Sequence, residues 1–187
     1  MTPEDPGVAL RPAKSADADV IARINVAGWR ASYRGIVDDH VLDEVSVERR
    51  ALALQHLLGT PGVGAWIAES GGEPVAYATF GPSRDPDAPA GTGELSALYV
   101  DPPRVSRGLG ATLIARAEAS LRDLGYVRAT LWVLAANAGA RRFYERLGWA
   151  PDGQARTFRW GERDLPIVRY ARELAAADAA SRQKGRT

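Results

Sequence analysis

The segment Leu98–Ala111 constrains the fold more than any other part of this sequence. In it, the end of a strand (Glu94–Val100) precedes a proline turn and two glycines that open a helix. Apolar residues then recur at helical spacing, at Leu109, Leu113, Ile114, Ala117, Leu121 and Leu124. An apolar strand follows at Val127–Leu134. A strand, a helix and a second strand in this order predict an α/β domain with a parallel pair inside a mixed sheet.

The turn before this helix has the features of an anion site. The first N–H groups of a helix have no intrahelical acceptor and carry a partial positive charge. Gly108 and Gly110 leave the backbone open to close approach, and Arg104 and Arg107 add positive charge. The alternative is that the two glycines only ease a tight turn. A dinucleotide or P-loop site is disfavoured, because Leu113 replaces the third glycine of G-x-G-x-x-G and no Gly-Lys-Ser/Thr follows.

The rest of the chain shows periodic segments separated by turn residues. We expect further strands at Val8–Leu10, Gly64–Glu69, Pro74–Phe80, Thr157–Trp160 and Leu165–Tyr170. Ser15, Ser46 and Asn137 are the expected N-caps of three further helices. We expect a disordered N-terminus at 1–7, a single domain at 8–174 and a flexible tail at 175–187. The stretch 81–93 is expected to be a flexible surface loop.

Composition excludes several classes of protein. The chain has 187 residues, no Cys and two His, which excludes disulfides and a cysteine acyl-enzyme, and we expect no metal site. A net charge of +1 gives no bulk attraction to nucleic acid or to anionic membranes. The sequence shows neither the apolar run of an export signal nor the roughly 18 apolar residues of a membrane span. We therefore expect a cytoplasmic protein that binds neither nucleic acid nor membrane.

Two separate motifs carry a resemblance to a known family. The first is Leu98–Ala111, and the second is Leu131-Trp132-Val133-Leu134 with Asn137 and the stretch Arg142–Trp149. Together they resemble the GNAT superfamily of acyl-CoA-dependent N-acetyltransferases. The two motifs span about Glu94–Pro151, and the elements before and after them extend the resemblance to Val8–Leu174.

The resemblance implies a fold and a donor. The fold would be a mixed, mostly antiparallel twisted sheet whose central parallel βαβ unit is splayed to hold acyl-CoA, with about four flanking helices. The pyrophosphate of acetyl-CoA would rest on the backbone amides of 105–111, and the pantetheine arm would pair with Leu98 and Val100 at an open sheet edge. The implied cofactor-binding residues are Leu98, Tyr99, Val100, Val105, Ser106, Arg107, Gly108, Leu109, Gly110, Ala111, Asn137, Ala140 and Phe143.

Acetyl transfer to an amine needs a proton acceptor and a proton donor. An amine with a pKa near ~10.4 is mostly protonated at neutral pH, and the leaving thiolate must gain a proton. Glu94 is the candidate base, because strand alternation places it on one face with Ser96, Leu98 and Val100. A solvated carboxylate at a strand end is the alternative. The resemblance makes Tyr144 the candidate acid, with a core tyrosine as the alternative.

The acceptor side is less specific. Trp29 and Tyr33 lie four residues apart and share a helix face, and members of the resembling family with such an element place it by the acceptor pocket. Core packing is the alternative, and for Trp29 it is the preferred interpretation. We expect the acidic turn at Asp38-Asp39-His40 to be solvated, and Trp132 to serve packing only.

Two functions stay open at this point. In the first, the chain transfers acetyl from acetyl-CoA to a primary amine of a small molecule or peptide. Direct attack in a ternary complex is favoured because the chain has no Cys. In the second, the same fold is a non-catalytic acyl-CoA sensor. This is motivated by Val105, where the family usually has Gln or Arg, and by Ser106, where many members have Gly. Both a monomer and a homodimer stay open.

Overall fold

The computed structural model describes residues 7–105, 108–160 and 163–174. The helices are α1 (Ala18–Tyr33), α2 (Asp39–Asp43), α3 (Val47–Leu58), α4 (Leu109–Asp123) and α5 (Ala138–Arg146). The strands are β1 (Val8–Pro12), β2 (Gly64–Ser70), β3 (Glu73–Pro82), β4 (Thr92–Val100), β5 (Arg128–Leu134), β6 (Ala150–Trp160) and β7 (Arg163–Glu173). Short 3₁₀ turns occupy Ser15–Asp17 and Pro102–Arg104.

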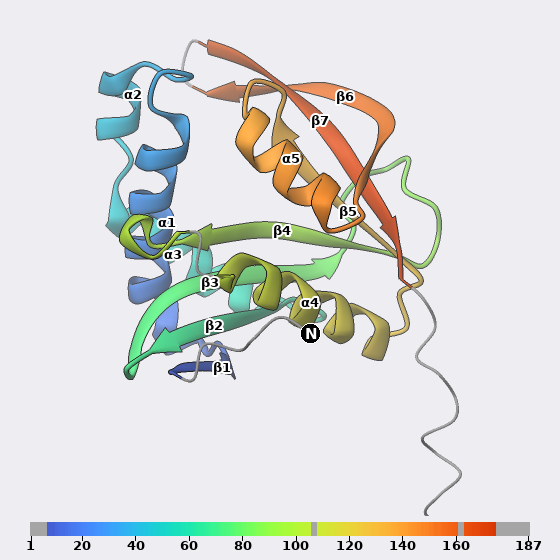
Figure 1. Cartoon of the computed structure of the whole chain (residues 1–187), viewed down its shortest axis with the longest axis horizontal. Coiled ribbons are helices and arrows are strands. Elements are labelled where there is room, and N and C mark those ends of the chain that lie inside the picture. The colour runs from blue at the N-terminus through green and yellow to red at the C-terminus, as the bar shows by residue number, and fades with distance from the viewer. Residues whose placement is uncertain (1–6, 106–107, 161–162, 175–187) are drawn as a thin grey trace, which may run out of the picture.

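The strands form one mixed sheet in the order β1-β2-β3-β4-β5-β7-β6. β4 and β5 run parallel, and every other neighbouring pair is antiparallel. Helix α4 connects the parallel pair, as the strand–helix–strand pattern predicts (Figure 1). The predicted mixed and mostly antiparallel α/β fold is therefore confirmed. The described residues form five α-helices where about four were expected.

The two faces of the sheet carry separate hydrophobic clusters. Ala76 and Ala78 of β3 pack with α4 on one face, whereas Tyr77 between them packs with α1 and α3 on the other. Phe143 and Tyr144 of α5 join the cluster that contains α4. The helices α4 and α5 therefore cover one face, and α1 and α3 cover the opposite face (Figure 1).

The parallel strands β4 and β5 separate along their length. Within the described residues they pair only where Thr92–Glu94 meets Arg128–Thr130. Beyond this point β4 continues to Val100 and pairs with β3 on its other side. The edge of β4 that faces β5 therefore has free backbone N–H and C=O groups from Leu95 onward. An open edge of this kind can accept an extended ligand as an additional strand.

A β-bulge in β4 changes which side chains share a face. The pairing of β4 with β3 skips Ser96, which is the extra residue of the bulge. Leu95 consequently packs in the same cluster as Leu98 and Val100. The expectation that Glu94 shares a face with Leu98 and Val100 is therefore wrong, because the bulge breaks the period of two between them.

The predicted N-cap residues mark the starts of two helices. The Ser46 hydroxyl accepts a backbone N–H in the first turn of α3 at 3.3 Å. The side-chain oxygen of Asn137 accepts the N–H of Ala140 at 3.0 Å in the first turn of α5. Ser15 does not cap α1, because it begins a 3₁₀ turn and α1 starts three residues later. The two Ser/Asn caps hold α3 and α5 at fixed starting points.

Two segments are more ordered than the sequence predicts. A short helix, α2, replaces the solvated turn expected around Asp39. The stretch 81–93 is not a flexible surface loop, because β3 runs to Pro82, β4 begins at Thr92, and Asp85 between them is only 7% exposed. Of the expected terminal segments 1–7 and 175–187, all but residue 7 lie outside the described residues.

Candidate functional site

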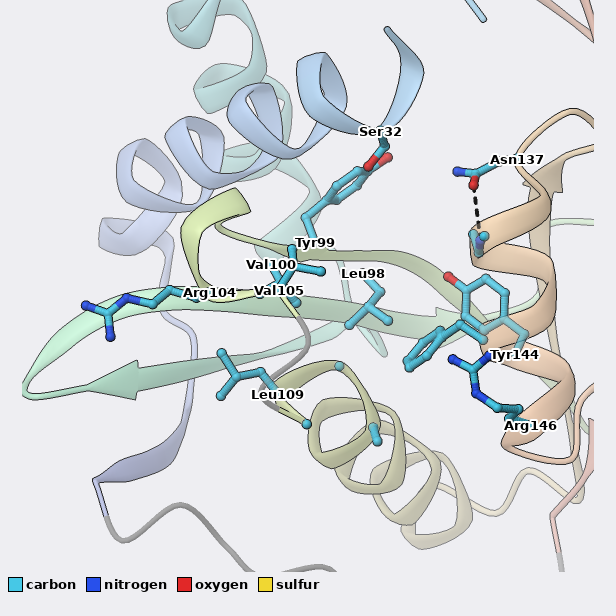
Figure 2. Close-up of a pocket in the computed structure, with 16 residues that line it drawn as sticks. Ser32, Leu98, Tyr99, Val100, Arg104, Val105, Leu109, Asn137, Tyr144 and Arg146 are labelled. Atoms are coloured by element: carbon cyan, nitrogen blue, oxygen red, sulfur yellow. Dashed lines mark hydrogen bonds between the residues drawn. The ribbon is translucent and has the colours of Figure 1, made fainter. Parts of the chain in front are cut away.

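An outer cavity of about 670 Å³ lies where β4, the N-terminus of α4 and the helix α5 meet. In Figure 2 the end of β4 and α5 approach it from opposite sides, and α4 lies below. It is lined by Ser32, Leu98, Tyr99, Val100, Arg104, Val105, Gly108, Leu109, Gly110, Ala111, Asn137, Gly139, Ala140, Phe143, Tyr144 and Arg146.

The start of α4 gives this cavity an anion-binding wall. Gly108 adopts the left-handed conformation, with φ of +79°, and so turns the first N–H groups of α4 outward without strain. At Gly110 a Cβ atom would lie only 3.0 Å from Cζ of Phe143, so the missing side chain lets α4 and α5 approach closely. Arg146 adds positive charge to the lining, whereas the guanidinium group of Arg104 points away from the start of α4 and lies beside Ser70 (Figure 2). Backbone donors, a helix dipole and the guanidinium group of Arg146 together suit a phosphate.

The structure brings the predicted cofactor-binding residues together. Those that line the outer cavity are Leu98, Tyr99, Val100, Val105, Gly108, Leu109, Gly110, Ala111, Asn137, Ala140 and Phe143. Ser106 and Arg107 lie outside the described residues. The segments that meet here come from β4, α4 and α5, in the arrangement that the two sequence motifs predict.

An inner cavity of about 110 Å³ lies in the gap between β4 and β5. It is lined by Ser32, Tyr33, Leu95, Ser96, Ala97, Leu98, Tyr99, Leu131, Trp132, Val133, Asn137, Ala140 and Tyr144. It shares Leu98, Tyr99 and Tyr144, among others, with the outer cavity, so the two spaces adjoin. A chain that ran along the open edge of β4 would pass from the outer cavity into the inner one.

Tyr144 lies at the junction of the two cavities. It extends from α5 toward β4 and lines both spaces (Figure 2). Burial raises the pKa of the Tyr144 hydroxyl above its ordinary value, so the phenol keeps its proton at neutral pH. A protonated phenol at this position can donate a proton to a leaving group that is held between the cavities.

Glu94 lies outside the lining of both cavities. Its side chain is 5% exposed and pairs with Arg84, whose Nη2 donates to Oε1 at 2.5 Å and whose Nε donates to Oε2 at 3.1 Å. The backbone N–H of Arg84 donates to Oε2 as well, at 3.2 Å. The carboxylate is therefore satisfied by donors from the β3–β4 connection, and its role as a base stays a prediction.

The two residues predicted for the acceptor side have different positions. Tyr33 lines the inner cavity, and its hydroxyl lies 3.5 Å from the hydroxyl of Tyr99. Trp29 is 9% exposed and belongs to the core, where its ring packs 4.3 Å from Tyr33 and 4.1 Å from Trp160 between ring centroids. Trp29 supports the ring of Tyr33 and does not line either cavity, which agrees with the core interpretation.

Sequence reasoning did not assign several lining residues. Ser32 lines both cavities, Ser96 and Trp132 line the inner one, and Arg146 lines the outer one. Trp132 does more than pack in a buried strand, because β4 has separated from β5 at this level and leaves its side chain half-buried beside the cavity. Ser32 could have been found from the sequence, because it follows Trp29 by one helical turn and adjoins Tyr33, which was assigned to the acceptor side.

The described residues contain neither a cluster of metal-ligating side chains nor a membrane-spanning helix. Among 7–105, 108–160 and 163–174, no group of three or more His, Cys, Asp or Glu is arranged to hold a metal ion. Within the same ranges, no helix combines the length and apolar character needed to cross a membrane.

Comparison with known proteins decides the family. The model of the acetyltransferase (GNAT) family matches residues 29–149. The chain belongs to the GNAT family of acetyltransferases. A protein from Mycobacterium tuberculosis named "probable N-acetyltransferase" is 33% identical over 156 residues, which cover 82% of this chain and 84% of that protein.

Solved structures support the same GNAT fold. YncA from Salmonella typhimurium, solved with acetyl-CoA, has a TM-score of 0.66 and 26% identity, covering 92% of this chain and 99% of that chain. PaiA N-acetyltransferase from Thermoplasma acidophilum, solved with coenzyme A, has a TM-score of 0.68 at 16% identity, covering 89% and 98%. The range matched by the GNAT model contains every site residue predicted from the sequence.

Proposed function

We propose that this GNAT protein transfers an acetyl group from acetyl-CoA to a primary amine of a small molecule or peptide, by direct attack in a ternary complex. The observation that carries the proposal is the open edge of β4. One end of this edge lies at the N-terminus of α4, and the other lies beside Tyr144. An anion site, a strand edge for pairing and a proton donor therefore follow one another along β4.

The lining of the outer cavity fits acetyl-CoA. The first amides of α4, with Arg146, would hold its phosphates, because they offer N–H donors and positive charge. The free backbone groups of Leu98 and Val100 would pair with the amides of the pantetheine arm. Val105 is 57% exposed at the rim and contributes no charge there, so the backbone amides and Arg146 would carry the phosphate contacts.

The chemical step makes one bond and breaks one bond. The amine nitrogen attacks the thioester carbonyl carbon, a C–N bond forms, and the electron pair of the C–S bond leaves on sulfur. Tyr144 would donate its proton to that sulfur and regain one from solvent. The chain holds no Cys, so the acetyl group passes to the amine without a cysteine thioester on the protein.

The amine must also lose a proton. Among the described residues, neither cavity is lined by a carboxylate or an imidazole. The proton therefore leaves through water, and Glu94 can receive it only by way of bridging solvent. This gives Glu94 an indirect place in the reaction, in keeping with its ion pair to Arg84.

A turnover assay tests this function. The purified chain is mixed with acetyl-CoA and a panel of primary amines that includes polyamines, amino acids, aminoglycosides and peptides with free N-termini. We expect release of free coenzyme A thiol and one acetyl added to the amine by mass spectrometry. Tight acetyl-CoA binding with no acetylated product across the panel would contradict catalysis and favour an acyl-CoA sensor.

A further inference from the structure

The side chain of Trp132 forms a wall of the inner cavity. Trp132 lines that cavity and not the outer one. It lies on the α1 side of β5, where it packs against the cluster that contains Trp29 together with Tyr33 and Tyr99. The neighbouring β5 residues Leu131 and Val133 point to the opposite face, into the cluster of α4. Trp132 therefore borders the space on the side away from the α4 anion site.

A buried carboxylate fixes the orientation of this indole. The Nε1–H of Trp132 donates to both oxygens of Asp85, at 2.9 and 3.1 Å. The Asp85 side chain is 2% exposed, although it lies in the connection between β3 and β4. A carboxylate that accepts one indole N–H with both oxygens holds the ring in one plane. Breaking that contact would leave the indole N–H without its acceptor, whereas both Asp85 oxygens also accept from arginines.

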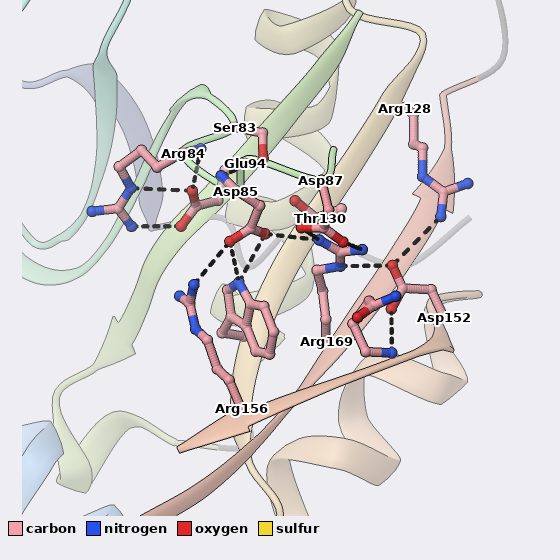
Figure 3. A network of polar contacts seen from close by, with 12 residues as sticks. Ser83, Arg84, Asp85, Asp87, Glu94, Arg128, Thr130, Asp152, Arg156 and Arg169 are labelled. Atoms are coloured by element: carbon pink, nitrogen blue, oxygen red, sulfur yellow. Dashed lines mark hydrogen bonds and ion pairs between the residues drawn. The ribbon is translucent and has the colours of Figure 1, made fainter. Parts of the chain in front are cut away.

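Asp85 is itself held by two arginines from the far end of the chain. Arg156 of β6 and Arg169 of β7 donate to Asp85 at 3.0 and 3.2 Å, and Figure 3 shows Asp85 between them. The guanidinium carbon of Arg156 also lies 4.0 Å from the ring centroid of Trp132 and covers one face of it. Trp132 is thus clamped at its N–H and on one ring face.

We propose that Asp85 is a positioning residue that holds Trp132 as the acceptor-side wall of the inner cavity, and that this wall limits the bulk of the amine that can react. The proposal rests on the acetyl transfer proposed above. A fixed indole in the wall of the inner cavity would admit an unbranched primary amine and exclude one that carries a branch or ring next to the nitrogen. Arg156 and Arg169 lie outside the range matched by the family model, so the clamp is built by this chain's own β6 and β7.

Two variants and one matched control test this proposal. Asp85→Asn weakens the clamp, and Trp132→Phe removes both the indole N–H and part of the wall. Asp152→Asn is the control, because Asp152 is also nearly buried, binds Arg169 at 2.7 Å and does not contact Trp132. The first measurement is the ¹H–¹⁵N spectrum of the Trp indole groups, in which Trp132→Phe identifies the Trp132 resonance.

The expected results separate positioning from stability. In Asp85→Asn, the Trp132 indole resonance shifts and its N–H exchanges with solvent at least about tenfold faster, whereas Asp152→Asn leaves both unchanged. The ratio of kcat/KM for a branched amine to that for an unbranched amine rises at least about fivefold in Asp85→Asn and Trp132→Phe, through KM for the amine. KM for acetyl-CoA stays at the wild-type value. The double variant gives no further gain, because both changes act on one wall.

Failure of the proposal is distinguishable from failure of the proposed function. The positioning role is overturned if the Trp132 resonance is unchanged in Asp85→Asn. It is also overturned if Asp152→Asn shifts that resonance and speeds N–H exchange as much as Asp85→Asn does. Both outcomes can be measured even if no acceptor has been found. An unchanged amine ratio in Trp132→Phe overturns the selectivity role, and this variant decides the point if Asp85→Asn does not fold. A wild-type chain with no turnover refutes the acetyl transfer, while the spectra still decide the clamp.

Discussion

Replacement of Gly28 by Ala tests how α1 positions the cavity wall. Gly28 is buried in the interior of α1, and a Cβ atom built there would lie 2.8 Å from Cδ1 and 3.3 Å from Cβ of Tyr99. Carbon atoms in contact prefer about 3.5–4.0 Å, so the Tyr99 ring would have to move by about 0.7 Å or more. Tyr99 lines both cavities, so a displacement of its ring would change their shape.

The magnitude follows from two opposing effects. Ala in place of Gly within a helix stabilises by up to about 1 kcal/mol, whereas overpacking a core costs about 1–3 kcal/mol. We therefore expect Gly28→Ala to lower the free energy of unfolding by about 1 kcal/mol in urea denaturation. Because the displaced ring changes the shape of both cavities, we also expect KM to rise for acetyl-CoA or for the amine.

A matched glycine provides the control. Gly139 in the first turn of α5 has room for a Cβ, whose nearest neighbour would be the Asn137 side-chain oxygen at 3.7 Å. Gly139→Ala should therefore stabilise the fold by about 0.5–1 kcal/mol. If Gly28→Ala stabilises as much as Gly139→Ala and leaves both KM values unchanged, the ring of Tyr99 is not held against α1.

Of three further predictions, two concern proton transfer and one concerns the ion pair between Arg11 and Asp17. Tyr144→Phe should lower kcat by about 10²-fold or more with the Kd for acetyl-CoA unchanged, and an unchanged kcat would remove its role as the acid. The sequence-based role of Glu94 predicts that Glu94→Gln lowers kcat/KM by about 10²-fold and alters its pH profile, and an unchanged profile would assign the amine proton to solvent alone. Asp17 accepts two hydrogen bonds from Arg11, at 2.8 and 2.9 Å, which lower the pKa of Asp17 below its ordinary 3.8. At a pH above 3.8, Asp17→Asn should therefore lower the free energy of unfolding by about 0.5–1 kcal/mol, measured in urea. This difference from wild type should vanish as the pH falls through the lowered pKa of Asp17. A difference that persists at low pH would contradict the ion-pair origin.

The parts of the site that depend on local sequence could be predicted. Gly108, the helix that follows it and the Asn137 cap depend on neighbours within a few residues, so their spacing in the sequence is sufficient. The family resemblance, and not these local signals, implied that the end of β4, α4 and α5 meet around one cavity. The resemblance carried by the two motifs predicts most of the residues that line the outer cavity.

The parts that depend on pairing between distant strands could not be predicted. The bulge at Ser96 exists only when β3 and β4 pair, and it moves Glu94 off the expected face. Strand β6 begins seven residues before the predicted start at Thr157, because nearly all of its residues are exposed and no alternation marks it. The clamp on Trp132 joins Asp85 to Arg156, 71 residues away in the sequence. A pattern of neighbouring residues cannot predict a contact between residues so far apart in the sequence.

The most direct test of the central claim is thermal unfolding of the chain with acetyl-CoA or coenzyme A, compared with NAD and ATP at matched concentrations. A ligand present at 100 times its Kd adds about 2.7 kcal/mol to the free energy of unfolding. For a domain of 187 residues this corresponds to a rise in Tm of about 5–10 °C. The open edge of β4 and the start of α4 predict this rise with the two coenzyme A ligands and none with NAD or ATP. A folded chain whose Tm does not respond to either coenzyme A ligand would contradict the acyl-CoA site.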